Sequence, residues 1–181
     1  MEKTLDVKPL AEKAYELGFE YEKKYGGCSQ CIIASLQDTF GEQNDDIFKS
    51  STGLVGGVGG LTDTGCGAYV AGAMFLSSHT GRERSNLDDL DALHKTLDVV
   101  TKLHDRFIQE YGTAICRNIH MKLLGRNYYL QDEDEWAKFE NAGGHTKICP
   151  EVVGKAARWV VEIMYQEELI STINPNEGKN K

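Results

Sequence analysis

The five cysteines of this chain are the residues with the most distinctive chemistry. Cys28 and Cys31 form a CxxC pair, and Cys66, Cys116 and Cys149 follow at long intervals. A CxxC pair suits either dithiol redox chemistry or two ligands of a metal. The long intervals match neither a compact ferredoxin pattern nor a zinc site with two CxxC knuckles, so any shared site must be assembled by the fold.

Each cysteine lies within about one turn of a predicted helix start. A helix N-terminus presents unpaired N–H groups and the positive end of the macrodipole, and both favour a thiolate over a thiol. The thiolate is the form that acts as a nucleophile and binds metals. Free cysteine is also a common buried residue, so plain packing explains any one of the five more easily than it explains all of them.

Helical periodicity dominates the rest of the chain. Apolar residues recur at helical spacing over about residues 10–25, 28–40, 66–76, 86–111, 113–123 and 149–164, with shorter helices near 45–48 and 136–139. The expected N-caps are one of the polar residues at 62–64 for the third long helix, Ser85 or Asn86 for the fourth, and Thr113 for the fifth. No strand pattern of similar quality occurs. We therefore predict an all-α fold, a compact multi-helix bundle, with one redox-type domain over residues 1–170 and a polar tail over 171–181.

The longest of these helices carries one apolar stripe. Its members follow one another in steps of three and four: Leu90, Leu93, Leu97, Val100, His104, Phe107 and Tyr111. Such a stripe is typical of a helix-packing surface, and we expect it to be buried in the core or between two subunits of a homodimer. His104 is then a core histidine in preference to a metal ligand.

A glycine-rich segment, residues 53–60, comes shortly before Cys66. It lacks the Gly-Lys-Ser/Thr ending of a phosphate-binding loop and contains no GxGxxG, so nucleotide binding is not predicted. Glycines allow backbone to approach another group closely, and we expect this loop to line the cysteine site. The glycines expected beside a cofactor are Gly57, Gly59, Gly60 and Gly65.

The composition of the chain argues against several classes of protein, among them nucleic-acid-binding, secreted and membrane-spanning proteins. The 28 acidic and 20 basic side chains give a formal net charge of −8, and no segment concentrates enough Lys and Arg to bind nucleic acid. Charged residues interrupt any secretory signal at the start, and the longest apolar stretch, residues 68–76, is too short to span a membrane. We therefore expect a cytoplasmic protein, in whose reducing surroundings metal binding or redox chemistry explains several cysteines better than disulfides do.

Four short segments carry a resemblance to a known family. They are Gly27-Cys28-Ser-Gln, Gly65-Cys66-Gly-Ala68, Ile115-Cys116-Arg-Asn118 and Ile148-Cys149-Pro150. Together, within about residues 10–165, they resemble the C_GCAxxG_C_C family of redox-active proteins. Gly67 stands where the family name has alanine, Val70 stands where it has glycine, and Cys31 lies outside the named pattern.

The resemblance implies a small helical electron-transfer or redox protein with an iron–sulfur centre, often a dimer. Its four named cysteines correspond here to Cys28, Cys66, Cys116 and Cys149. The chain has no CxxCH, so no haem is expected.

Three hypotheses follow. The first is an electron carrier that binds an iron–sulfur cluster through these four cysteines, with Cys31 left open as a further ligand, and that exchanges electrons with a redox partner protein. The second is a thiol–disulfide oxidoreductase that works through Cys28 and Cys31, with Cys66 or Cys149 resolving. The third is a binding protein with structural zinc. The sequence assigns no catalytic residue.

Overall fold

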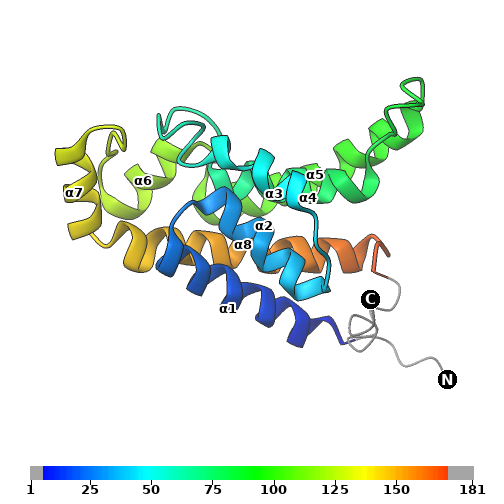
Figure 1. Ribbon diagram of the computed structural model, residues 1–181, viewed down its shortest axis with the longest axis horizontal. Helices are drawn as coiled ribbons and strands as arrows, with labels where there is room; N and C mark the ends of the chain where they lie inside the picture. The colour runs from blue at the N-terminus through cyan, green and yellow to red at the C-terminus, as the bar shows by residue number, and fades with distance from the viewer. Residues whose placement is uncertain (1–5, 171–181) are drawn as a thin grey trace.

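The computed structural model describes residues 6–170, and the predicted tail over 171–181 lies outside them. Within these residues, eight α-helices follow one another: α1 (Val7–Tyr25), α2 (Cys28–Phe40), α3 (Asp45–Ser50), α4 (Gly67–Thr80), α5 (Leu90–Tyr111), α6 (Cys116–Leu124), α7 (Glu133–Asn141) and α8 (Cys149–Gln166) (Figure 1). A 3₁₀ turn (Thr52–Leu54) and a wide π-type turn (Gly144–Ile148) complete the elements. No strand occurs among these residues, so the all-α prediction is confirmed.

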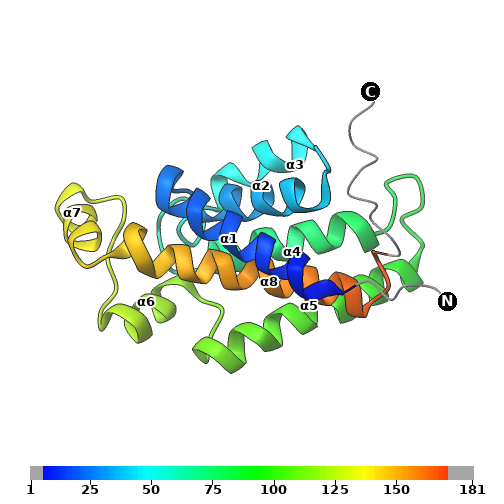
Figure 2. The ribbon, with the colours of Figure 1, turned by 90° about the horizontal axis from the view of Figure 1, so that it is seen from below.

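Helix α8 is the central element of the molecule. It packs against α1, α2, α4 and α5, and in Figure 2 it runs along the length of the bundle. Gly18 of α1 and Gly154 of α8 let the two helices approach closely, because a Cβ on Gly154 would lie 2.9 Å from the carbonyl oxygen of Tyr15. This close contact packs α1 directly against α8.

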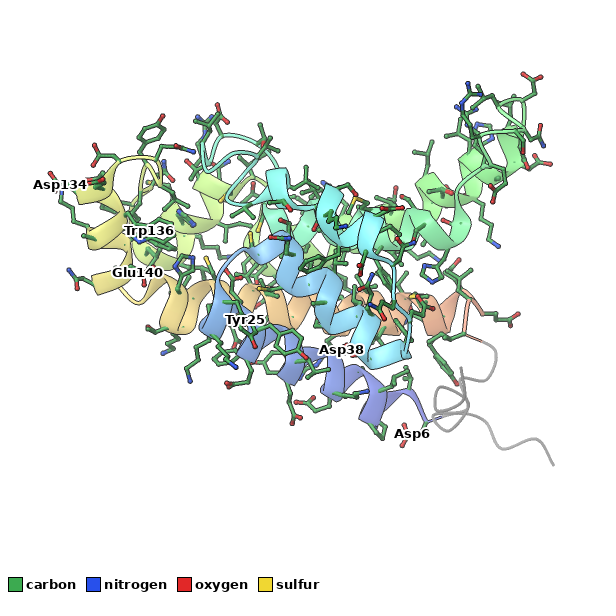
Figure 3. All side chains as sticks on the ribbon, in the orientation of Figure 1. Asp6, Tyr25, Asp38, Asp134, Trp136 and Glu140 are labelled. Atoms are coloured by element: carbon green, nitrogen blue, oxygen red, sulfur yellow. The ribbon has the colours of Figure 1, made fainter. Side chains whose placement is uncertain are left out.

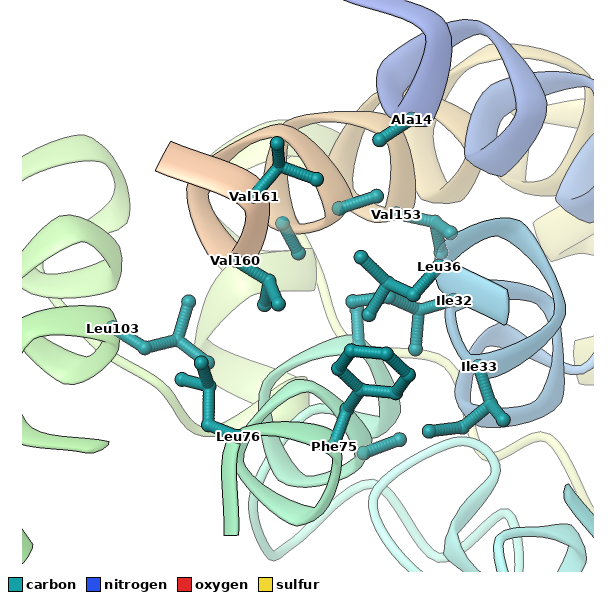
Figure 4. Packing of buried hydrophobic residues seen from close by; sticks show 14 of the residues in the cluster. Ala14, Ile32, Ile33, Leu36, Phe75, Leu76, Leu103, Val153, Val160 and Val161 are labelled. Carbon is teal, nitrogen blue, oxygen red and sulfur yellow. The ribbon is translucent and has the colours of Figure 1, made fainter. Parts of the chain in front are cut away.

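The core fills the space around α8. Figure 4 shows buried side chains from five helices meeting there, among them Ala14, Ile32, Leu36, Phe75, Leu103, Val153 and Val160. Full burial of a large aliphatic or aromatic side chain contributes roughly 1.5–3 kcal/mol of transfer free energy. The core therefore holds five helices in one fixed arrangement, and that arrangement positions the helix starts.

Three predicted N-caps were wrong. Cys66 itself is the N-cap of α4, because Gly65 is held in an extended bridge with Ile115 and the helix cannot begin earlier. Ile115 likewise precedes α6 in place of Thr113. Helix α5 begins after Asp89, whose side chain accepts a hydrogen bond from the amide of Ala92 (2.8 Å).

The predicted apolar stripe of α5 is only partly buried. The buried residues of this helix are Val99, Leu103, Phe107 and Tyr111. Leu90 and Leu97 are 55% and 54% exposed, so the core of the single chain does not bury them. Burial between two subunits, the other predicted alternative, stays a prediction. The first turns of α5 extend past the other helices at the right of Figure 1, and this leaves the early part of the stripe without a neighbour.

Within residues 6–170, no helix has the length and apolar character that crossing a membrane requires.

Candidate functional site

Four cysteines line one cavity. Cys28, Cys116 and Cys149 are the first residues of α2, α6 and α8, and Cys66 is the N-cap of α4. All four lie on the wall of a cavity of about 60 Å³, whose lining also includes residues of α7. Cys31 is not on this wall, and its thiol donates to the carbonyl of Gly26 (3.1 Å). The fold therefore brings together the four cysteines that the sequence singled out.

Backbone pairing holds Cys66 beside Cys116. The amide of Cys66 donates to the carbonyl of Ala114 (2.8 Å), and the amide of Cys116 donates to the carbonyl of Thr64 (2.9 Å). These bonds flank the isolated bridge between Gly65 and Ile115. Two helix starts that are 50 residues apart in the chain are thus joined directly.

Two glycines make room for two of the sulfur-bearing side chains. A Cβ on Gly67 would lie 2.3 Å from Sγ of Cys28, which no real structure tolerates. A Cβ on Gly57 would lie 2.9 Å from Cβ of Cys116, and Gly57 also has a positive φ of 72° that disfavours other residues. The cysteine site is therefore packed against glycine backbone on two sides.

The glycine-rich loop contacts the site with only part of its length. Gly56 lines the cavity and Gly57 is buried behind it, whereas Gly59 is exposed and has no neighbour within 4 Å of an added Cβ. Gly60 packs against the side chain of Gln131 and is not on the cavity wall. Residues 56–60 all have positive φ, and this left-handed run turns the chain outward after Gly57. The positions of Gly59 and Gly60 therefore disagree with the prediction that the whole loop lines the site.

Burial raises the pKa of all four thiols. Neighbouring thiols raise the pKa of Cys28, Cys116 and Cys149 further. The pKa of Cys66 rises least, to about 11, because the amides of Ala68 and Tyr69 donate hydrogen bonds to its sulfur. Burial thus outweighs the expected preference of helix starts for a thiolate. In the metal-free protein the four groups are thiols, and all five cysteines are free of disulfides.

No group of three or more His, Cys, Asp or Glu side chains within residues 6–170 is arranged to hold a metal ion. The four cysteines share the wall of one cavity without forming such a group.

A comparison with protein families identifies the group to which the chain belongs. The family described as "Putative redox-active protein (C_GCAxxG_C_C)" matches residues 27–163. This chain is a member of that family. The matched segment contains all four cysteines of the cavity. No curated protein and no solved structure matches the chain.

The rest of the cavity wall in this C_GCAxxG_C_C protein is mostly apolar. Its apolar members are Val55, Ile119, Leu130, Trp136, Phe139, Ile148, Val152 and Val153. Figure 3 locates Trp136 on α7, where its side chain is 41% exposed. Trp136 therefore connects the cavity with the surface of the protein.

Glu22 is a buried acid on the cavity wall that the sequence analysis missed. Its side chain is 1% exposed, and its Oε2 has no hydrogen-bond partner. Its Oε1 lies 3.8 Å from Nε2 of His145, whose Nδ1 contacts Glu140. Burial raises the pKa of Glu22 to about 6, against the opposing effects of His145 and Cys31. In the sequence, the burial of Glu22 could have been inferred from its position one helical turn after Gly18, on the buried face of α1.

His120 is the second polar residue that the sequence analysis missed. It is 3% exposed, and its Nε2 lies 3.8 Å from Sγ of Cys116. Burial lowers its pKa to about 4, so the ring is neutral at physiological pH. The interval of four residues between Cys116 and His120 places both on one face of a helix, and that spacing was the available signal.

Proposed function

We propose that this C_GCAxxG_C_C protein is an electron carrier in which Cys28, Cys66, Cys116 and Cys149 hold an iron–sulfur cluster. The observation that carries the proposal is that these four cysteines, from four separate helix starts, line one cavity. Four cysteine thiolates are the usual ligand set of both [2Fe–2S] and [4Fe–4S] clusters. The family description as redox-active agrees with this chemistry.

The distribution of the sulfurs favours a cluster over a single zinc ion. Structural zinc requires four donors around one ion, and no group of even three donors is so arranged within the described residues. In a cluster with four cysteine ligands, each iron takes only one or two protein sulfurs, and inorganic sulfide supplies the others. The absence of a three-donor group among the described residues therefore weighs more against a single zinc ion than against a cluster.

The surrounding residues support this role. Amides of Gly56, Ala68 and Tyr69 donate hydrogen bonds to cysteine sulfurs, and such bonds stabilise the thiolate form. The apolar wall keeps water from the sulfurs. Binding of metal releases the protons of the four thiols, because metal ligands must be deprotonated. A bound cluster would accept one electron from a reduced partner protein and donate one to an oxidised partner.

The thiol–disulfide alternative is less well supported. Cys31 is outside the cavity, and burial raises the pKa of both Cys28 and Cys31. A dithiol enzyme needs an accessible thiolate with a lowered pKa. Neither cysteine of the CxxC pair has these properties.

Anaerobic purification followed by metal and sulfide analysis tests the proposal. We expect brown protein with about two or four irons per chain, an equal amount of acid-labile sulfide, and visible absorption that bleaches on reduction. Colourless, metal-free protein with a titratable dithiol would overturn the proposal in favour of thiol–disulfide exchange. Colourless protein that contains zinc would overturn it in favour of structural zinc.

A further inference from the structure

Two buried polar atoms next to the cysteine site lack hydrogen bonds. They are Nδ1 of His120 and Oδ1 of Asn127, and the two side chains are neighbours. Asn127 Nδ2 meanwhile donates to Oγ1 of Thr62, which is itself buried (3.1 Å). A buried polar group without a hydrogen bond destabilises a fold, so these two atoms require an explanation.

A half-turn of the Asn127 amide exchanges its oxygen and nitrogen, and so directs an N–H donor to the His120 side and an acceptor to the hydroxyl of Thr62. In this assignment Nδ1 of His120 is the acceptor of the pair. A neutral imidazole has one N–H, so Nδ1 as an acceptor requires the proton to be on Nε2. Nε2 is the atom 3.8 Å from the sulfur of Cys116. Every polar atom of the group then has a partner if the sulfur of Cys116 is an acceptor.

The surroundings keep the His120 ring in this position. The ring stacks on Phe139, with centroids 5.2 Å apart and planes at 28°. Thr62, at the other end of the network, accepts a backbone bond from Arg117 (2.7 Å) and has a positive φ of 65°. The hydrogen-bond network is therefore anchored to α6 and to the loop before α4 together.

We propose that His120, oriented by Asn127 and Thr62, is a positioning residue that donates an Nε2–H hydrogen bond to the sulfur of Cys116 and thereby raises the reduction potential of the cysteine centre. This inference rests on the proposed function. A hydrogen bond to a ligating sulfur stabilises the reduced, more negative state more than the oxidised state, so its presence raises the potential.

The experiment compares midpoint potentials of the loaded wild-type protein and three variants. His120→Phe keeps the stacking on Phe139 but lacks the donor, and we expect its potential to fall. Asn127→Leu leaves the ring without its orienting partner, and we expect a smaller shift in the same direction. His79→Phe is the matched control, because His79 also packs on a ring (Phe75, 4.8 Å) but contacts no cysteine; its potential should equal that of the wild type. An unchanged potential in His120→Phe overturns the inference.

A second readout needs no cluster and separates this inference from the proposed function. If wild-type protein contains no iron and sulfide, the proposed function fails, and the hydrogen bond is tested by alkylation of the metal-free protein. Removing a donor from a cysteine sulfur slows its alkylation. Mapping of labelled peptides should show Cys116 reacting several-fold more slowly relative to Cys66 in His120→Phe, with no change in His79→Phe. An equal ratio in all proteins overturns the inference.

Discussion

The cavity end of the molecule and the far end of α5 are built in opposite ways. At the cavity end, helix starts and irregular loops meet, the backbone has a run of positive φ over residues 56–60, and Glu22 and His120 are buried among apolar side chains. At the far end a regular amphipathic helix leaves Leu90 and Leu97 exposed. Figure 1 shows the two regions at opposite ends of the long axis.

The contrast indicates that the structural features that reduce stability are concentrated around the cavity. Buried acids and imidazoles and left-handed backbone each reduce the stability of a fold, and they accumulate around functional sites. Over residues 81–97, at the far end, no acid or histidine is buried and no residue has a positive φ. The early part of α5 there lacks a neighbouring helix. Substitutions at the cavity end should therefore alter redox properties, whereas substitutions along α5 should alter stability alone.

The largest expected effect is at Gly67. Gly67→Ala should lower iron retention, because the new Cβ would lie 2.3 Å from Sγ of Cys28 and that sulfur would have to shift within the cavity. Gly72→Ala in the same helix is the matched control, since its Cβ meets Leu103 at 3.0 Å but no cysteine. It should lower stability and keep the cofactor. The iron content per chain is measured for both purified variants. A wild-type iron content in Gly67→Ala would show that the tight packing does not position Cys28.

The next largest effect is a loss of folding stability, which depends on which face of α5 is buried. Leu103→Ala should lower the free energy of unfolding by about 2–5 kcal/mol, because the side chain is fully buried between helices. Leu97→Ala should cost less than about 1 kcal/mol, because half of that side chain is exposed. Urea denaturation measures both. Equal losses would mean that Leu97 has a partner in solution.

Such a partner would be the homodimer that the sequence predicts. Light scattering at micromolar concentration measures it directly. A strictly monomeric protein would leave Leu90 and Leu97 exposed and remove the homodimer prediction.

The third effect concerns Glu22 in the metal-free protein. Burial raises its pKa from 4.5 to about 6, so folding favours the protonated acid. The stability that this preference supplies is fully present below about pH 4.5 and is lost as pH rises through about 6. By about pH 7.5 the ionised carboxylate should cost about 2 kcal/mol, and Glu22→Gln should avoid that loss. Urea denaturation at both pH values measures it. Exposed Glu20→Gln is the control, and identical pH profiles for wild type and Glu22→Gln would contradict the prediction.

Much of the fold follows from local sequence signals. Gly41, Gly112 and Gly125 follow the last residues of α2, α5 and α6, and each adopts the left-handed conformation that closes a helix. Pro150 lies in the first turn of α8, as its missing N–H allows. Local signals of this kind place each cysteine near the start of a helix. That four of the cysteines line one cavity follows from how the helices pack.

The rest depends on contacts between distant segments. The N-cap of α4 depends on the bridge to Ile115, which no local pattern reveals. The stripe of α5 has the right spacing, yet only neighbouring helices decide which of its faces is buried. Glu22 and His120 have only weak local signals, the position after Gly18 and the spacing from Cys116, and packing of distant segments places both residues in the cavity.

The central claim is that four cysteines form one centre and that Cys31 is outside it. The most direct test is iron per chain after anaerobic purification of five single Cys→Ser variants, each compared with the wild type. We expect Cys31→Ser to retain wild-type iron, and we expect Cys28→Ser, Cys66→Ser, Cys116→Ser and Cys149→Ser to lose most of it. Complete iron loss from Cys31→Ser, or full retention by any of the other four, would contradict the claim.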